Sequence, residues 1–166
     1  MWRSEGDRAA MKRLHGLLLR LKKVATPMAK TEQHVLEDIP MLRAAIDQAL
    51  HEDDANCYRL CNLVEALSHL PDVGSVPELL EVFFRFRYSY GRALAAKALH
   101  VTAPDHFREK LAMECLRDCE ARTRIHGEKA ASLETHDATG RLRHLASDPW
   151  EDEEVRAEAR KRMDEC

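Results

Sequence analysis

The clearest hydrophobic pattern in the chain runs from Val76 to Pro104. Its first half carries apolar side chains at i, i+3, i+4 and i+7, which is one face of an α-helix; they are Val76, Leu79, Leu80 and Phe83. A Ser-Tyr-Gly break at 89–91 precedes an Ala-rich second stripe, made of Leu94, Ala95, Ala98 and Leu99. The stretch therefore predicts two helices joined by a turn, with Ser75 as the first N-cap and Pro77 in the first turn.

Parts of this helix pair recur further along the chain at a spacing of 32 residues. Three kinds of position repeat together: an arginine, a small residue three positions later, and a lysine two positions after that. They are Arg92, Arg124 and Arg156, then Ala95, Gly127 and Ala159, then Lys97, Lys129 and Lys161. A helix pair of this kind buries its apolar faces only against stacked copies, so the recurrence predicts a repeat architecture.

The last repeat unit carries the motif that points to a family. Asp148-Pro149 forms a turn ahead of Val155-Arg156 and Ala159, and this turn-then-Val-Arg-x-x-Ala pattern resembles the short HEAT repeats of bacterial HEAT-like proteins. The resemblance extends from Asp38 to Met163. It implies an all-α fold, an α-solenoid of about four helix pairs, with each repeated arginine tying the start of a second helix to the inter-helix turn. Tetratricopeptide and ankyrin signatures are missing.

Residues 1–30 form a basic segment ahead of the HEAT-like repeat domain at 31–166, and we expect the whole chain to be one compact domain. The segment holds eight basic and two acidic residues. Between Arg8 and Ala25 its apolar residues form one stripe, which predicts an N-terminal helix that caps the stack. The same helix could instead lie on an anionic membrane, form part of a mitochondrial transit peptide, or bind nucleic acid weakly.

Composition and charge narrow the class of protein. Of 166 residues, 33% are charged and 5% aromatic, as in soluble helical proteins, and no stretch approaches the 18 uncharged apolar residues of a membrane span. Five cysteines are too sparse for a disulfide scaffold, which favours a cytoplasmic, reducing location. The net charge alternates from +6 at 1–30 to −9 at 31–84 and +4 at 85–129. This argues against a continuous nucleic-acid-binding face and permits a protein partner with complementary patches.

Two cysteine pairs, Cys57/Cys61 and Cys115/Cys119, have i, i+4 spacing. Four thiolates can bind zinc tetrahedrally. Each pair, however, lies on an apolar stripe, where a free cysteine packs as a small hydrophobic side chain. We interpret both pairs as core residues and expect no metal site.

Two His/Glu pairs resemble the iron-binding motifs of HEAT-type deoxyhypusine hydroxylase: His51-Glu52, and His126 with Glu128. That family repeats a contiguous His-Glu at the start of second helices. Here the contiguous pair falls in a turn and the other is interrupted by Gly127. There is no Gly-rich phosphate loop either. We therefore expect no catalysis and no cofactor, with a metal- or cofactor-dependent HEAT-type enzyme or lyase as the alternative.

The lysines at the repeated position are the most specific polar feature. Equivalent positions on stacked helices stand about 10 Å apart, which suits separate carboxylates on an acidic protein better than phosphates about 3.4 Å apart. We predict a non-catalytic protein-binding module that serves as an adaptor, a regulator or a toxin-neutralising partner. Its partner-binding residues would be Lys97, Lys129 and Lys161.

Overall fold

The computed structural model describes residues 16, 39–51, 57–70 and 72–165. These residues form helices and short connections, and no strand occurs among them, so the expected all-α class is confirmed. The basic helix predicted within residues 1–30 lies outside the described residues except for Gly16, which is helical. Within the described ranges, no helix is long and apolar enough to cross a membrane.

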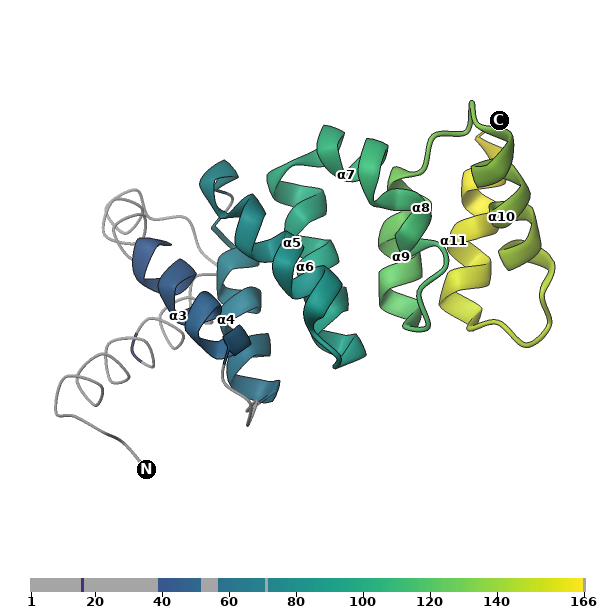
Figure 1. Cartoon of the computed structure of the whole chain (residues 1–166). Coiled ribbons are helices and arrows are strands. Elements are labelled where there is room, and N and C mark those ends of the chain that lie inside the picture. The colour runs from purple at the N-terminus through teal and green to yellow at the C-terminus, as the bar shows by residue number, and fades with distance from the viewer. Residues whose placement is uncertain (1–15, 17–38, 52–56, 71, 166) are drawn as a thin grey trace, which may run out of the picture.

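The helices follow one another along the molecule as successive pairs (Figure 1). In chain order they are α3 (Ile39–His51), α4 (Cys57–Ser68), the 3-10 turn η1 (Val73–Ser75), α5 (Val76–Arg85), α6 (Ser89–Thr102), α7 (Pro104–Lys110), α8 (Ala112–Cys115), α9 (Ala121–Ala130), α10 (His136–Ser147) and α11 (Glu153–Asp164). Helix α3 packs on α4, α5 on α6, α8 on α9, and α10 on α11. The second helices α4, α6, α9 and α11 also pack on one another in that order.

The α5–α6 pair agrees with its sequence pattern, with two corrections at its ends. Leu79 and Phe83 are buried as predicted, and Ser75 occupies the predicted N-cap position of α5, but its side chain makes no capping hydrogen bond. Its hydroxyl donates instead to the Asp72 carboxylate at 2.7 Å. The turn predicted at 89–91 lies earlier, at 86–88, because those residues are extended and α6 already begins at Ser89.

Two glycines sit where helices or rings approach closely. A Cβ at Gly91 would lie 2.2 Å from the Phe86 ring. A Cβ at Gly127 would lie 2.8 Å from the backbone oxygen of Ala112 in α8. Helix α9 runs through Gly127 and uses the lack of a side chain at this residue to lie against α8.

The segment from Pro104 to Cys115 forms two short helices, α7 and α8, which are separated at Leu111. Phe107 and Leu111 are buried, and Cys115 is buried as predicted. Cys119 lies beyond α8 in the following turn and is exposed, so its assignment to the core is wrong. Its sulfur accepts a hydrogen bond from Arg92 Nη2 at 3.3 Å.

The repeated arginines bind the turns that join the helices of each pair. Each donates from Nη1 to a backbone carbonyl of its own turn: Arg92 to Arg87 at 3.5 Å, Arg124 to Asp118 at 2.8 Å, and Arg156 to Pro149 at 3.4 Å. The structural role expected for these arginines is therefore confirmed.

Two of the three arginines also reach forward to the next turn. Arg92 binds both carboxylate oxygens of Asp118, each at 3.1 Å. Arg124 pairs with Glu151. A planar guanidinium can bind a carbonyl and a carboxylate at once, so these side chains connect consecutive helix pairs.

Candidate functional site

The three repeated lysines lie on successive second helices. Lys97 is half-buried on α6, while Lys129 on α9 and Lys161 on α11 are exposed. Lys161 Nζ lies 3.8 Å from a Glu158 carboxylate oxygen. Lys97 and Lys129 have no ion-pair partner within the described part of the chain. Because α6 packs on α9, these two unneutralised charges come from helices in contact.

Two histidines that the repeat pattern did not single out accompany these lysines. The His100 and His126 rings meet edge to face with centroids 5.9 Å apart, and His100 also stacks on Phe107 at 5.0 Å. Burial, with smaller contributions from His100, Lys129 and Lys97, lowers the pKa of His126 to about 4. Burial and Lys129 also lower the pKa of His100. Both imidazoles are therefore neutral near pH 7, and the positive charge of this surface belongs to the lysines.

Glu128 is a buried carboxyl group between α9 and α11. Its side chain is fully buried, and neither carboxyl oxygen has a hydrogen-bond partner among the described residues. Burial raises the pKa of Glu128 to about 8, with Glu158 and Glu151 adding to the shift and Arg124 opposing it. Perturbed carboxyl groups mark many active sites. Glu128 lacks solvent access, however, so it cannot meet a substrate in this conformation.

The two His/Glu pairs that resemble iron-binding motifs do not come together into one site among the described residues. His126 and Glu128 are two residues apart on α9, so their side chains leave the helix in different directions. His51 is exposed and bonds the Asp47 carbonyl at 2.8 Å, whereas Glu52 lies outside the described residues. No group of three or more His, Cys, Asp or Glu side chains among the described residues could hold a metal ion.

The cysteine pairs are largely packing residues. Cys61 and Cys115 are buried, and Cys57 is half-buried. Burial raises the pKa of Cys61 to about 11 and that of Cys115 to about 12. Both thiols are therefore protonated and unreactive near neutral pH.

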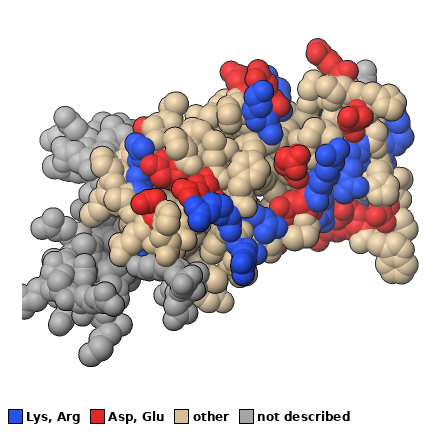
Figure 2. Space-filling view, in the orientation of Figure 1, with Lys and Arg blue, Asp and Glu red and all other residues tan. Residues whose placement is uncertain are grey.

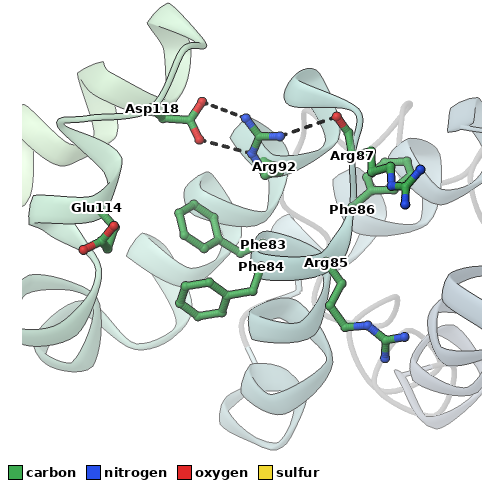
Figure 3. Close-up of a pocket in the computed structure, with 8 residues that line it drawn as sticks. All are labelled: Phe83, Phe84, Arg85, Phe86, Arg87, Arg92, Glu114 and Asp118. Carbon is green, nitrogen blue, oxygen red and sulfur yellow. Dashed lines mark hydrogen bonds and ion pairs between the residues drawn. The ribbon is translucent and has the colours of Figure 1, made fainter.

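A hollow of about 360 Å³ lies between α5 and α8. Its lining comes from α5, from the two inter-helix turns, from the start of α6 and from α8: Phe83, Phe84, Arg85, Phe86, Arg87, Arg92, Glu114 and Asp118. Figure 3 shows the Phe83 and Phe84 rings directed across the gap toward Glu114. In the space-filling view the surface is hollowed near its middle, with acidic and basic side chains beside the hollow (Figure 2).

The charges of the hollow are only partly paired. Arg92 holds Asp118 (Figure 3), and Arg85 pairs with Glu81 on its own helix. Burial alone would raise the pKa of Asp118, but the Arg92 guanidinium outweighs it and lowers this pKa below its usual value. The side chains of Arg87 and Glu114 have no partner within the ranges described. The hollow therefore presents the unpaired carboxylate of Glu114, whereas the Arg87 guanidinium is directed away from Glu114, on the other side of the α5–α6 turn (Figure 3).

Aromatic rings continue from the hollow over the α5–α6 turn. Phe86 meets Tyr88 edge to face at 6.3 Å, and Tyr88 meets Tyr58 at 6.4 Å and Tyr90 at 6.2 Å. The Arg122 guanidinium lies 5.3 Å from the centre of the Tyr90 ring. We call these five residues the tyrosine edge.

The sequence contains a signal for the hollow that helical periodicity alone does not reveal. Residues 83–90 read FFRFRYSY. Adjacent residues of a helix point about 100° apart, so Phe83 and Phe84 cannot both enter the same core. Phe83 is 5% and Phe84 64% exposed. An aromatic pair followed by alternating arginines and rings therefore predicts an aromatic surface at this turn.

Comparison with known proteins supplies no relative for this chain. No protein-family model, no curated protein and no solved structure matches it. The likeness to HEAT repeats consequently rests on the repeated residues themselves. What these residues do in the structure, above all the three arginines that bind the turns, is the basis for a proposal about function.

Proposed function

We propose that the protein is a short α-solenoid of HEAT-like helix pairs that binds another protein without catalysing a reaction. The helix packing and the repeated arginines support this architecture, and the free thiols bear on the compartment. The helices pair in sequence order and the second helices pack consecutively. The register of 32 residues places Arg92 and Arg124 at equivalent positions, where each binds its own turn and the next one. The free thiols of the described cysteines fit a reducing compartment such as the cytoplasm.

The single observation that carries the binding function is the pair of unneutralised lysines on adjacent second helices. Lys97 and Lys129 have no acidic partner in the described chain, and both contribute to the low pKa of His126. Lysine charges at a protein surface that no carboxylate neutralises attract acidic surfaces over roughly a Debye length, about 8 Å at physiological salt. An acidic face of a partner protein is the complementary surface, and Lys161 extends the contact along α11.

The test is charge reversal of all three lysines in the full chain. A partner captured on the wild-type protein should bind the Lys97→Glu, Lys129→Glu, Lys161→Glu variant about tenfold more weakly or worse at low salt, mainly through slower association. Wild-type affinity should fall as salt is added, and the variant should lose most of that dependence. Stopped-flow or surface-based kinetics measures both quantities.

A matched control changes the net charge equally elsewhere. Lys110, Arg117 and Arg143 are exposed and lie outside the second helices, so reversing all three should weaken binding far less. Both variants should keep the helical circular-dichroism signal, because exposed charges contribute little to stability. Equal affinity of the lysine variant and the wild type at low salt would refute the proposed binding face.

A further inference from the structure

The hollow between α5 and α8 offers a second surface with a different chemistry. We propose that it docks a segment of another protein, which seats a large apolar side chain against Phe84 and places a carboxylate beside Arg87. This surface is made by first helices and turns. The lysines lie on the second helices, so the two proposals are independent.

The apolar requirement comes from the phenylalanine pair. Phe83 is anchored in the core and meets Phe84 edge to face at 5.1 Å, which holds the Phe84 ring in place. Phe84 remains 64% exposed beside an open volume of about 360 Å³. That volume falls in the range of ligand pockets. Burial of a large exposed aromatic face is favourable, so an apolar side chain is the natural occupant.

The charged requirement comes from the groups left unpaired. Arg92 and Arg85 are already held by Asp118 and Glu81. Arg87 and Glu114 have no partner in the part of the chain that is described. A complementary occupant therefore brings an N–H donor or a basic side chain to Glu114 in the hollow. Where it continues over the α5–α6 turn, it brings a carboxylate to the Arg87 guanidinium, which points away from Glu114 (Figure 3). A polypeptide supplies both beside an apolar residue.

The tyrosine edge extends this surface beyond the hollow. Tyr58 is 73% exposed and Tyr88 37%, and the edge-to-face contacts hold the rings in one row. Aromatic residues and arginine are enriched in protein interfaces and dominate their hot spots. The edge gives an extended segment further rings to contact, whereas a small molecule would fill only the hollow. A nucleic acid is disfavoured because the unpaired carboxylate of Glu114 would repel its phosphates.

The experiment selects short random peptides displayed on phage against the full-length protein. Selected peptides should share a large apolar residue followed closely by Asp or Glu. A synthetic consensus peptide should bind Phe84→Ala about tenfold or more weakly than wild type, as loss of an aromatic hot spot does. Arg87→Glu should weaken binding comparably, and a peptide with Lys in place of its acidic residue should recover it. Both residues are exposed, so both variants should fold, which circular dichroism checks.

Matched controls separate this surface from the others. Trp150 is 93% exposed in the turn before α11, so Trp150→Ala removes an even more exposed ring elsewhere and should leave peptide affinity unchanged. The lysine triple variant should also bind the peptide with wild-type affinity. The peptide-docking proposal can therefore hold even if the lysines bind no acidic partner.

Three results would overturn the docking proposal. The first is a selection in which every enriched peptide binds the Phe84→Ala and Arg87→Glu variants as tightly as it binds the wild-type protein. The second is a consensus without an acidic residue. The third is self-association of the protein, seen by sedimentation, that Phe84→Ala abolishes, because the occupant would then be a second copy of the chain.

Discussion

Helices α6 and α9 occupy equivalent places in the row, yet they are held there by different forces. In α6 the buried residues are almost all small or apolar: Gly91, Ala93, Leu94, Ala95, Ala96, Ala98, Leu99 and Thr102. In α9 they include charged and hydroxyl side chains: Thr123, Arg124, Gly127, Glu128 and Ala130. At the spacing of 32 residues, Glu128 is at the repeat position equivalent to Ala96, and Ala131 is at the position equivalent to Leu99. Helix α6 is therefore held mainly by apolar packing, whereas α9 buries polar and charged side chains and needs other interactions to hold it in place.

The replacement is a set of hydrogen bonds from arginine to backbone carbonyls. Arg162 of α11 donates from Nε to the Glu128 carbonyl at 3.0 Å and from Nη2 to the Ala131 carbonyl at 3.1 Å. The last carbonyls of a helix have no partner within the helix, so Arg162 satisfies two acceptors at the end of α9. Arg141 of α10 likewise donates to the carbonyl of Leu116, at the C-terminal end of α8, the helix on which α9 packs, at 3.1 Å. Equivalent repeat positions can therefore be occupied by polar helices where a neighbouring helix supplies donors.

The largest expected effect comes from making α6 like α9. Leu99 is fully buried, and Leu99→Ala installs the residue type found 32 positions later, at the C-cap of α9 (Ala131). We expect a loss of about 2–5 kcal/mol in the free energy of unfolding, because the substitution loses buried apolar area and leaves a cavity. Urea unfolding measures it. Val101 in the same helix is 53% exposed, so Val101→Ala should cost under about 0.5 kcal/mol; a similar cost for both variants would mean that apolar packing does not hold α6.

The second prediction concerns the carboxyl group that α9 buries in place of Ala96. The pKa of Glu128 is raised from its ordinary 4.5 to about 8. Between pH 4.5 and pH 8, therefore, the folded protein keeps a proton on Glu128 that the unfolded chain has already released. Stability should therefore fall as pH rises from about 4.5 to about 8, by at most about 1.4 kcal/mol per pH unit. Above both values the loss stays constant.

Glu128→Gln should remove this pH dependence while keeping the shape of the side chain. Chemical denaturation at pH 5, 6, 7 and 8 should show the variant gaining on wild type at each step. The exposed Glu134 gives the control, since Glu134→Gln should retain the slope of the wild type. A Glu128→Gln variant with an unchanged slope would show that the carboxyl group is not protonated in the folded protein.

The contrast between α6 and α9 also marks what the sequence could predict. The α5–α6 pair follows from periodicity, because apolar side chains at helical spacing leave few alternatives for which face is buried. Periodicity was less informative at α9, because its mostly polar residues form no apolar stripe. The reason for Gly127 is the backbone of α8 lying 2.8 Å from where a Cβ would be, and no local pattern reveals a contact of that kind.

The candidate surfaces divide in the same way. The lysines could be located because they repeat in register. The pairing of Arg92 with Asp118 and of Arg85 with Glu81, which leaves Arg87 and Glu114 free around the hollow, depends on side chains up to 26 residues apart. Charge counts by segment do not show which carboxylate each arginine reaches, so the hollow required three-dimensional positions.

The smallest expected effect tests the hydrogen bonds that hold α9. Arg162→Lys keeps the charge but loses the planar fork, and one ammonium group cannot reach both the Glu128 and Ala131 carbonyls with the same geometry. We expect a loss of about 1–2 kcal/mol, since one or two charge-assisted hydrogen bonds disappear while the packing of the alkyl chain remains. Hydrogen exchange should report the change locally, as faster exchange of amides in the last turn of α9 and little change in α6. Arg160 binds a single carbonyl, that of Ala146 at 3.2 Å, from an exposed position, so Arg160→Lys should change stability by under about 0.5 kcal/mol. If the two lysine variants are equally stable and the exchange of α9 amides is unaltered, the arginine contacts do not hold this helix, and its position must depend on the close approach of Gly127 to α8.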